Sequence, residues 1–292
     1  MKKLLIILLC LPLFTLAQQT YVPDDDFEQH LINEGYDNVL DDSVQTSAID
    51  TVSALYLGFF ISNISDLTGL EDFALLKNLS ISPSLNLTTL DVSQNILLEF
   101  LSCYGNNLTT LDVSNNTALT SLNCWGNQLT NLDVSQNTAL TDLNCGNNPL
   151  TSLDVSQNTD LTDLDCAHNY LTNLDVSQNT ALTFLSCNYN QLTSLDVRNG
   201  NNTNFIDFVT VNNPNLSCIN VDDFQYSSWN WTYIDPQHYF SNNCTPTSTQ
   251  EQTTSKELLK VTGVLGRETK QTNQPLFYIY DNGTVEKRIV IE

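Results

Sequence analysis

Leucine recurs along the middle of the chain with a period of 21 residues, in four separate registers. In one register a cysteine stands two positions after each leucine, and this register holds Leu101, Leu122, Leu143, Leu164 and Leu185. Another register places an Asp-Val pair directly after each leucine from Leu90 to Leu195. A period kept in strict register over five units predicts a repeat architecture, in which neighbouring units bury one continuous core.

One repeat unit, LTSLNCWGNQLTNLDVSQNTA, runs from Leu119 to Ala139. Its LxxLxC segment predicts a short strand in which leucine and cysteine point to one side and polar residues lie between them. The spacings of 3, 2, 5 and 3 between successive leucines and the cysteine do not fit a helical period. We therefore expect coils stacked about 4.8 Å apart, with their strands paired in parallel.

Two asparagines recur in every coil. The first follows the cysteine by three positions and is expected to turn the chain and to bond backbone groups of the next coil. Its members are Asn106, Asn127, Asn148, Asn169 and Asn190. The second follows the Asp-Val pair, at Asn95, Asn116, Asn137, Asn158 and Asn179.

This pattern resembles that of leucine-rich repeat proteins, whose signature segment reads LxxLxCxxNxL here, with cysteine in place of the usual last leucine or isoleucine. The resemblance covers about 52–221 and loosens before Leu87 and after Leu195. It implies a β-rich solenoid of 21-residue coils, with a parallel β-sheet on its concave face. Open solenoid ends need caps, which we assign to 18–51 and 222–244.

Both caps have readable signals. Asp24 or Asp25 is expected to cap a short helix that ends near Gly35. At the other end, four aromatic residues are expected to cover the last coil: Trp229, Trp231, Tyr233 and Tyr239.

The amino terminus has the order of a secretory signal peptide. Lys2 and Lys3 precede an apolar run that is too short to span a bilayer, and Ala17 ends a segment of small residues suited to cleavage. Residues 1–17 are therefore expected to be removed, with lipidation at Cys10 as the weaker alternative. We expect no membrane span in the rest of the chain and an exported protein, either secreted or on the cell surface.

After a Thr/Ser/Gln-rich linker at 245–256, three strands are expected at 258–264, 276–280 and 285–291. This tail, 257–292, closely resembles the type A carboxy-terminal sorting domain of type IX secretion, through its VLGR, FYIY and GTVEKR segments. The resemblance implies a Bacteroidota-type source and contact with the type IX secretion machinery. A plain accessory β domain is the alternative.

Eight cysteines fall into three groups: Cys10, the five of the repeat register, and Cys218 with Cys244. Cysteines stacked in parallel strands point the same way, so the five are expected to be buried thiols rather than disulfides or zinc ligands. Cys218 and Cys244 are the natural disulfide pair of an exported protein, and closing that loop is worth about 3 kcal/mol.

The chain carries a formal net charge of −23. Between residues 18 and 244 there are 27 acidic residues and two basic ones, Lys77 and Arg198. This balance argues against nucleic acid and against anionic membrane surfaces as partners. One aspartate per coil follows the second-half leucine, at Asp91, Asp112, Asp133, Asp154, Asp175 and Asp196. These aspartates either bind calcium or, as we favour, accept N–H groups of their own turns.

The sequence contains no nucleophile elbow, zinc-protease or phosphate-loop motif, so we expect neither an enzyme nor a cofactor or metal. The three histidines stand outside such motifs, and His168 occupies a position of varied residues, as expected of a solvated side chain. Asp142, Asp163 and Asp165 could form carboxylate pairs, but so many acids produce such pairs by chance.

Residues that flank the inward leucine and cysteine are expected to face outward from the sheet. They vary from coil to coil, and several are aromatic, which is typical of surfaces that bind a partner. The candidate partner-binding residues are Phe100, Tyr104, Trp125, Asp142, Asp163, Asp165 and Phe184. We expect recognition of another protein or adhesion; a structural surface protein without a ligand and a carbohydrate- or calcium-binding module are the alternatives.

Overall fold

The structure is a computed structural model that describes residues 18–58, 63–83 and 87–244, and the backbone of three strands between 258 and 289. The chain divides into two compact units, Met1–Cys244 and Thr245–Glu292. The expected signal peptide at 1–17, the linker at 245–256 and the turns of the tail lie outside the described residues.

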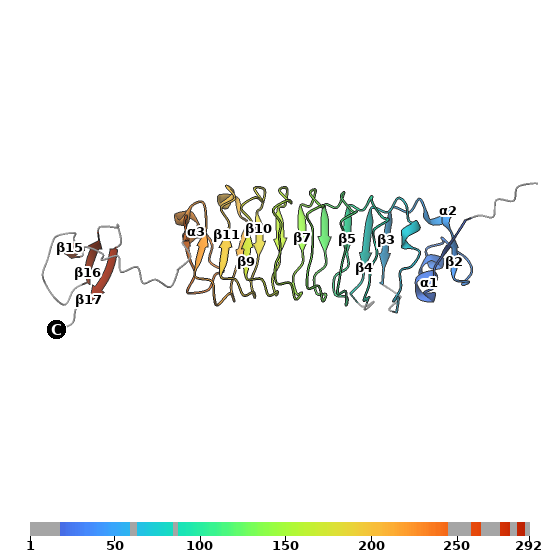
Figure 1. The fold of residues 1–292 in the computed structure, drawn as a ribbon, viewed down its shortest axis with the longest axis horizontal. Coiled ribbons are helices and arrows are strands. Elements are labelled where there is room, and N and C mark those ends of the chain that lie inside the picture. Colours follow the sequence, from blue (N-terminus) through green and yellow to red (C-terminus); the bar gives the residue numbers. More distant parts are fainter. Residues whose placement is uncertain are drawn as a thin grey trace, which may run out of the picture. The chain divides into compact units, whose positions relative to one another are not determined.

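The first unit is a solenoid whose coils follow one another in space as they do in sequence (Figure 1). Its larger sheet has eight strands, all paired in parallel. They are β3 (Ala54–Leu57), β4 (Asn78–Ile81), β5 (Phe100–Ser102), β6 (Ser121–Asn123), β7 (Asp142–Asn144), β8 (Asp163–Asp165), β10 (Phe184–Ser186) and β12 (Asp207–Val209). The repeat pattern therefore predicted the fold class correctly.

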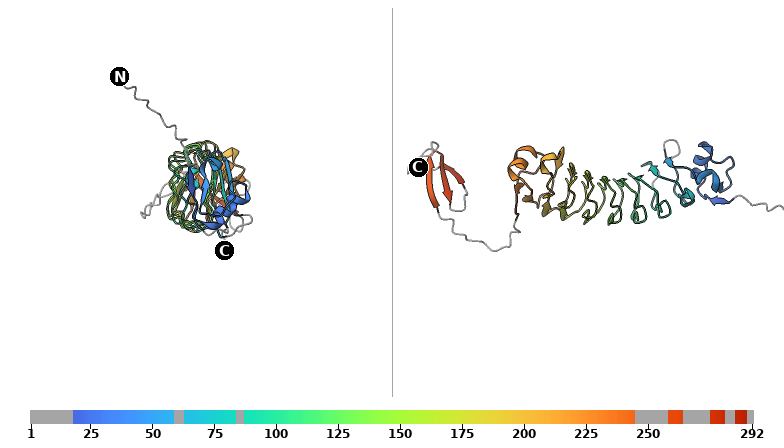
Figure 2. Two further views of the ribbon diagram at one scale, coloured as in Figure 1. Left: turned by 90° about the vertical axis from the view of Figure 1, so that its right-hand side faces the viewer. Right: turned by 90° about the horizontal axis from the view of Figure 1, so that it is seen from above.

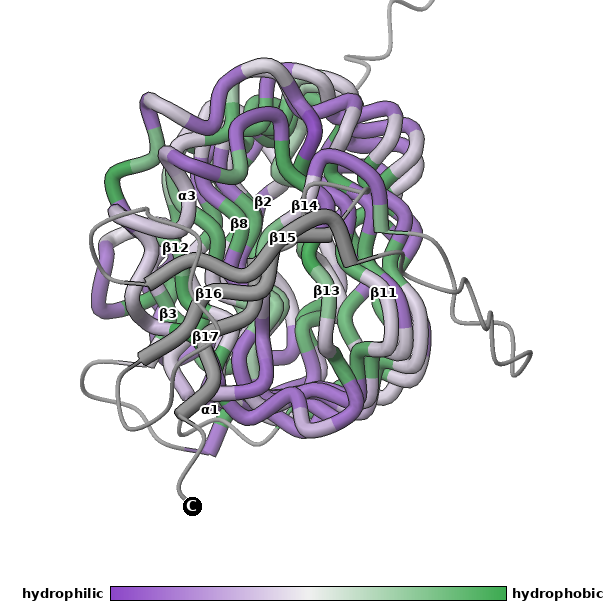
Figure 3. Tube along the Cα trace, turned by 90° about the vertical axis from the view of Figure 1, so that its left-hand side faces the viewer, coloured by the Kyte–Doolittle hydropathy of each residue, from purple (hydrophilic) through white to green (hydrophobic). Residues whose placement is uncertain are grey.

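A second parallel sheet begins in the Leu-Asp-Val half of the last coils and continues into the carboxy-terminal cap. Its strands are β9 (Asn173–Asp175), β11 (Ser194–Asp196), β13 (Cys218–Asn220) and β14 (Tyr239–Ser241). The end-on view in Figure 2 shows the coils superimposed, and Figure 3 places β3, β8 and β12 on one side of the coils and β11 and β13 on the other. Hydrophilic segments gather at the turns between these sides (Figure 3).

The core is the wall of inward leucines and cysteines that runs through all coils. Leu122, Leu143 and Leu164 are at most 2% exposed, and the five repeat cysteines are fully buried and unpaired. The expectation of buried thiols is thus confirmed. Because each coil buries its leucines against the coils on either side, the stack is stable only as an array.

The first asparagine of each coil ties that coil to the one before it. Asn127 Oδ1 accepts the N–H of Leu108 at 3.0 Å, and its Nδ2 donates to the carbonyls of Cys103 and Cys124 at 3.1 and 3.0 Å. Two of these three groups belong to the preceding coil, so the expectation of contacts with the next coil was wrong in direction. The second asparagine behaves alike: Asn137 Nδ2 donates to Val113 and Asn116.

The amino-terminal cap contains β1 (Gln19–Tyr21), α1 (Asp25–Asn33), β2 (Ser43–Gln45) and α2 (Thr46–Ile49). Asp24 caps α1 as expected, with its carboxylate accepting the N–H of Phe27 at 2.9 Å. Phe27 stacks on Phe73, just after the 3-10 turn η1 (Leu70–Asp72), at 6.4 Å between ring centroids. This contact joins the cap to the solenoid core.

The carboxy-terminal cap contains α3 (Phe224–Asn230) and β14, and the 3-10 turn η2 (Asn202–Asn204) precedes it in the last coils. Trp231 is buried and stacks on Phe208 at 4.1 Å, so it covers the last coil as expected. The other three aromatics do not: Trp229, Tyr233 and Tyr239 are 85%, 63% and 57% exposed. Trp229 lies in α3, Tyr233 in a β-bridge to Val209 and Tyr239 in β14, and their side chains remain exposed, which corrects the expectation for them.

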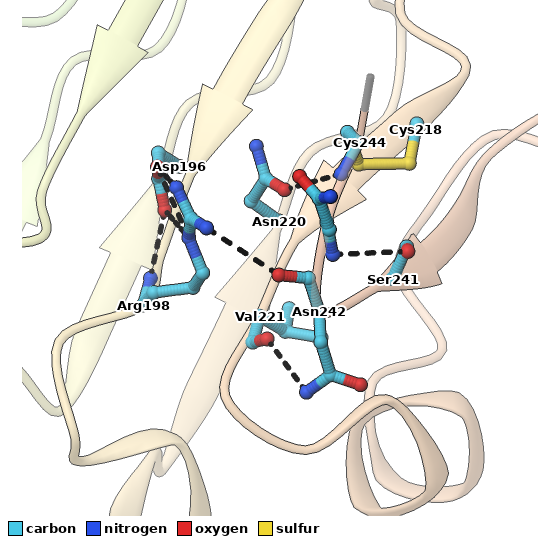
Figure 4. The surroundings of a disulfide bond; sticks show 9 residues. Asp196, Arg198, Cys218, Asn220, Val221, Ser241, Asn242 and Cys244 are labelled. Carbon is cyan, nitrogen blue, oxygen red and sulfur yellow. Dashed lines mark hydrogen bonds and ion pairs between the residues drawn. A yellow bond between two sulfur atoms is a disulfide. The ribbon is translucent and has the colours of Figure 1, made fainter.

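The predicted disulfide joins Cys218 of β13 to Cys244, with 5.8 Å between Cα atoms. Figure 4 shows it beside Asn220, whose carboxamide oxygen accepts the N–H of Cys244 at 2.7 Å. The Asp196–Arg198 ion pair lies on the neighbouring strand and reaches the carbonyl of Asn242. The bond therefore fastens the end of the solenoid to its last coils.

In the second unit, β15 (Leu258–Gly263), β16 (Pro275–Tyr280) and β17 (Val285–Ile289) form an antiparallel sheet. The three strands expected in the tail are thus present, and each overlaps its predicted range. Among the described residues of the whole chain, no helix is long and apolar enough to cross a membrane.

Candidate functional site

The parallel register of the larger sheet lines up equivalent side chains of successive coils in rows. Phe100 pairs with Ser121, Ser121 with Asp142, Asp142 with Asp163, and Asp163 with Phe184. The leucine that directly follows each of these residues faces the core. Because successive side chains of a strand point to opposite sides of the sheet, this row faces outward. The sheet therefore presents a phenylalanine at each end of a polar, acidic stretch.

Five of the seven predicted partner-binding residues line one shallow depression of about 350 Å³. They are Phe100, Asp142, Asp163, Asp165 and Phe184. Ser121, Asn123 and Asn144 contribute the rest of its polar floor. Both phenylalanines are half-buried, so their rings form its flanks rather than standing free in solvent. We call this depression the sheet-face depression.

Tyr104 and Trp125 lie beside the depression rather than in it, and are 38% and 39% exposed. The indole of Trp125 lies across Gly146 of the next coil. A β-carbon added at Gly146 would lie 2.9 Å from Trp125 Cδ1 and 3.1 Å from the carbonyl oxygen of Ala167. Glycine at this position thus leaves the space that the indole occupies, a role that the sequence pattern did not indicate.

The carboxylates of the sheet-face depression are not neutralised within the described part of the chain. Asp142 and Asp163 each accept one hydroxyl, from Thr141 at 2.6 Å and Thr162 at 2.7 Å. Asp165 accepts the N–H of Ala167 at 3.0 Å, and the second oxygen of each carboxylate has no hydrogen bond among the described residues.

The two basic residues of 18–244 are both engaged elsewhere. Lys77 pairs with Glu99 at 2.7 Å, and Arg198 pairs with Asp196. The sheet-face depression therefore offers uncompensated negative charge between aromatic walls, which suits a cationic side chain with an apolar stem.

The aspartates that follow the second-half leucines act locally, as we favoured. Asp133 Oδ1 accepts the N–H of Ser135 at 2.9 Å, and the same contact recurs at Asp91, Asp112, Asp154 and Asp175. Hydrogen bonds from the backbone and hydroxyl of Ser135 lower the pKa of the Asp133 carboxyl. Each carboxylate thus has a structural role in its own turn.

A buried acid that sequence reasoning missed lies in the amino-terminal cap. Glu28 is fully buried and accepts the N–H groups of Asp41, Asp42 and Ser43, each at 3.0 Å. These three donors compensate its charge and fix the loop that follows α1. Asp25, Asp37, Asp41 and Asp42 lie close to it, and the three hydrogen bonds give Glu28 a structural role.

The turn after each of β5, β6, β7, β8 and β10 has a left-handed residue. Its φ is +66° at Gly105, +69° at Gly126, +51° at Asn147, +55° at His168 and +54° at Tyr189. His168 is exposed, as expected, but the position is constrained rather than free to vary. Glycine and asparagine in three of five coils are the sequence signal for this conformation.

Three structures from Listeria monocytogenes are among the solved structures similar to this chain. The functional domain of InlJ from Listeria monocytogenes, which includes a cysteine ladder, is 36% identical, with a TM-score of 0.60. The match covers 78% of this chain and 48% of the InlJ chain, so this chain spans about half the length of that relative.

Internalin C2 from the same species is 17% identical over 77% of this chain and 97% of its own, with a TM-score of 0.58. The internalin inlF, also from L. monocytogenes, is 18% identical over 76% and 71%, with a TM-score of 0.52. A scan against protein families finds none that matches the chain, and a search of curated proteins finds no match either. The strand order, the 21-residue coils and these structural likenesses together show that the chain has the leucine-rich repeat fold.

Proposed function

We propose that this protein is exported and recognises another protein through the concave, solvent-facing side of its eight-stranded sheet. The observation that carries the proposal is the sheet-face depression, in which Phe100 and Phe184 flank the carboxylates of Asp142, Asp163 and Asp165. Half-buried aromatic rings supply apolar contact area at little entropic cost, and open carboxylates select a partner by charge. The fitting partner surface presents lysine or arginine side chains beside apolar ones.

Export is proposed from the ends of the chain. The signal-peptide pattern of 1–17 and the sorting-domain resemblance of 257–292 support passage through the periplasm and the outer membrane by type IX secretion. The protein would then be released or held at the cell surface. The half-buried Cys218–Cys244 disulfide is consistent with an oxidising compartment.

The recognition proposal is tested by photo-cross-linking on the cells that produce the protein. With p-benzoylphenylalanine in place of Phe184, we expect cross-links to a defined protein, which mass spectrometry identifies. Converting Asp142, Asp163 and Asp165 to asparagine should reduce their yield about tenfold, because the charged partner loses its counter-charges.

The matched control converts Asp112, Asp133 and Asp154 to asparagine. This triple variant changes the net charge equally but leaves the sheet face intact, so the cross-link yield should stay within about twofold of wild type. Equal losses in both triple variants, or no protein cross-link at all, would argue against recognition through this face and favour a structural role.

The sorting proposal is tested separately by deleting 257–292. Extracellular protein, measured by immunoblotting of the medium and intact cells, should fall to background while folded protein accumulates inside the outer membrane. The reporter for folding is the Cys218–Cys244 disulfide, because both of its cysteines lie in the first unit and the deletion removes neither. Undiminished export after the deletion would leave the tail as an accessory β domain.

A further inference from the structure

A second depression, of about 510 Å³, lies along the left-handed turns that follow the strands of the larger sheet. Its lining comes from the turns of successive coils, between Asn106 and Tyr189, and includes no residue of the sheet-face depression. We call it the turn depression. Strands spaced about 4.8 Å apart make it an elongated trough rather than a compact hole.

The lining of the turn depression is polar but carries no aspartate, glutamate, lysine or arginine. That is unusual for a unit with 27 acidic residues. Seven of its twelve lining residues carry a side-chain amide, and the rings of His168, Tyr170 and Tyr189 lie toward its carboxy-terminal end. A ligand matched to this surface is therefore polar and uncharged.

Two of these rings stand on strained backbone. His168 and Tyr189 have φ angles of +55° and +54°, where the equivalent residues of earlier coils are glycine or asparagine. Bulky residues seldom adopt this conformation, because the β-carbon crowds the backbone. The two rings stack at 4.2 Å between centroids with an interplanar angle of 11°, and Tyr189 remains 48% exposed. The chain thus keeps a costly conformation at the point where it displays a flat aromatic stack.

Some amides of the trough are open to a ligand. The buried ladder asparagines, such as Asn148, are fully engaged with backbone groups. By contrast, the side chain of Asn147 is exposed and makes no hydrogen bond among the described residues, and Gln128 uses only its Nε2, which donates to Asn107 at 3.2 Å. An amide offers donors and an acceptor on one planar group, which matches neighbouring hydroxyls.

We propose that the turn depression binds a neutral oligosaccharide. Its hydroxyls are both donors and acceptors, as the open amides of Asn147 and Gln128 require, and its apolar ring faces pack on the exposed rings of Tyr170 and Tyr189. The absence of charged lining residues disfavours acidic glycans and basic peptides. The turn depression shares no lining residue with the sheet-face depression. The oligosaccharide proposal can therefore be tested independently of the proposed protein recognition.

The test titrates residues 18–292 calorimetrically with cellohexaose, maltohexaose and mannohexaose, and with an oligogalacturonate as the acidic comparison. We expect one or more neutral hexasaccharides to bind. Replacing His168 and Tyr189 together by glycine should weaken that binding by at least about tenfold. Because Gly105 and Gly126 occupy the same turn position, this variant should fold with an unchanged or higher Tm.

Two further variants locate the effect. Tyr170→Ala should also weaken binding, whereas Tyr104→Ala combined with Trp125→Ala, on the sheet face, should leave the Kd within about twofold of wild type. The proposal is overturned if no neutral hexasaccharide binds at millimolar concentration, if only the oligogalacturonate binds, or if the glycine double variant binds as wild type does.

Discussion

Replacing Asn148 by leucine should lower the free energy of unfolding by about 4 kcal/mol, although leucine is similar in size and more hydrophobic. Asn148 Oδ1 accepts the N–H of Leu129 at 3.0 Å, and its Nδ2 donates to the carbonyls of Cys124, Cys145 and Gly146 at 3.0 to 3.1 Å. The variant leaves the buried N–H of Leu129 without a partner, at a cost of about 1–3 kcal/mol.

The carbonyls lose less, because each keeps another donor. Cys124 retains the amide of Asn127, Cys145 retains that of Asn169, and Gly146 retains the N–H of Gly126. Their three weakened contacts add about 0.5–1 kcal/mol each. Urea unfolding, monitored by circular dichroism, measures the total change in the free energy of unfolding. Asn131→Leu, in the preceding coil and exposed, should change stability by less than about 0.5 kcal/mol. Equal effects of the two variants would contradict the assigned role of the asparagine ladder.

The sequence predicted the solenoid because its inward positions repeat without interruption. A leucine every 21 residues specifies both the length of a coil and the side that faces the core, so Leu122 and Leu164 could be placed before the structure was known. The second sheet was not predictable in this way. Leu132-Asp133-Val134 and Leu174-Asp175-Val176 are identical, yet only the latter includes strand residues, so the difference does not lie within one coil.

The candidate site was predictable in part, for a similar reason. Register places Phe100, Asp142 and Phe184 in one outward row, and the structure brings them into one depression. Whether the ring of Trp125 packs on the sheet or projects into solvent depends on the residue beside it in the next coil. Only the structure shows that this residue, Gly146, leaves space for the ring. The turn depression was missed because the residues at His168 and Tyr189 looked variable, whereas their shared backbone conformation was hidden.

Alkaline pH should unfold the protein because of the five stacked thiols. Burial raises the pKa of Cys124 and Cys187 from the ordinary 9.0 to about 12, and raises those of Cys103, Cys145 and Cys166 well above 9.0. Above pH 9 the unfolded chain loses these protons while the folded chain keeps them, so the free energy of unfolding falls as pH rises and is unaffected by the thiols below that pH. Each thiol then multiplies the unfolding equilibrium constant by about tenfold per pH unit.

Five thiols together give a factor of about 10⁵ per pH unit, against a total unfolding equilibrium of about 10³–10⁸ for small domains. The solenoid should therefore lose its structure within one or two pH units above pH 9, as urea titrations at successive pH values would show. In a variant with alanine at Cys124 and Cys145, the unfolding equilibrium constant should rise by about 10³ per pH unit, instead of about 10⁵. Val134→Ala removes a buried apolar group without a titrating one, so it should lower stability equally at pH 8 and pH 10. An unchanged slope in the cysteine variant would show that the ladder does not set the alkaline limit.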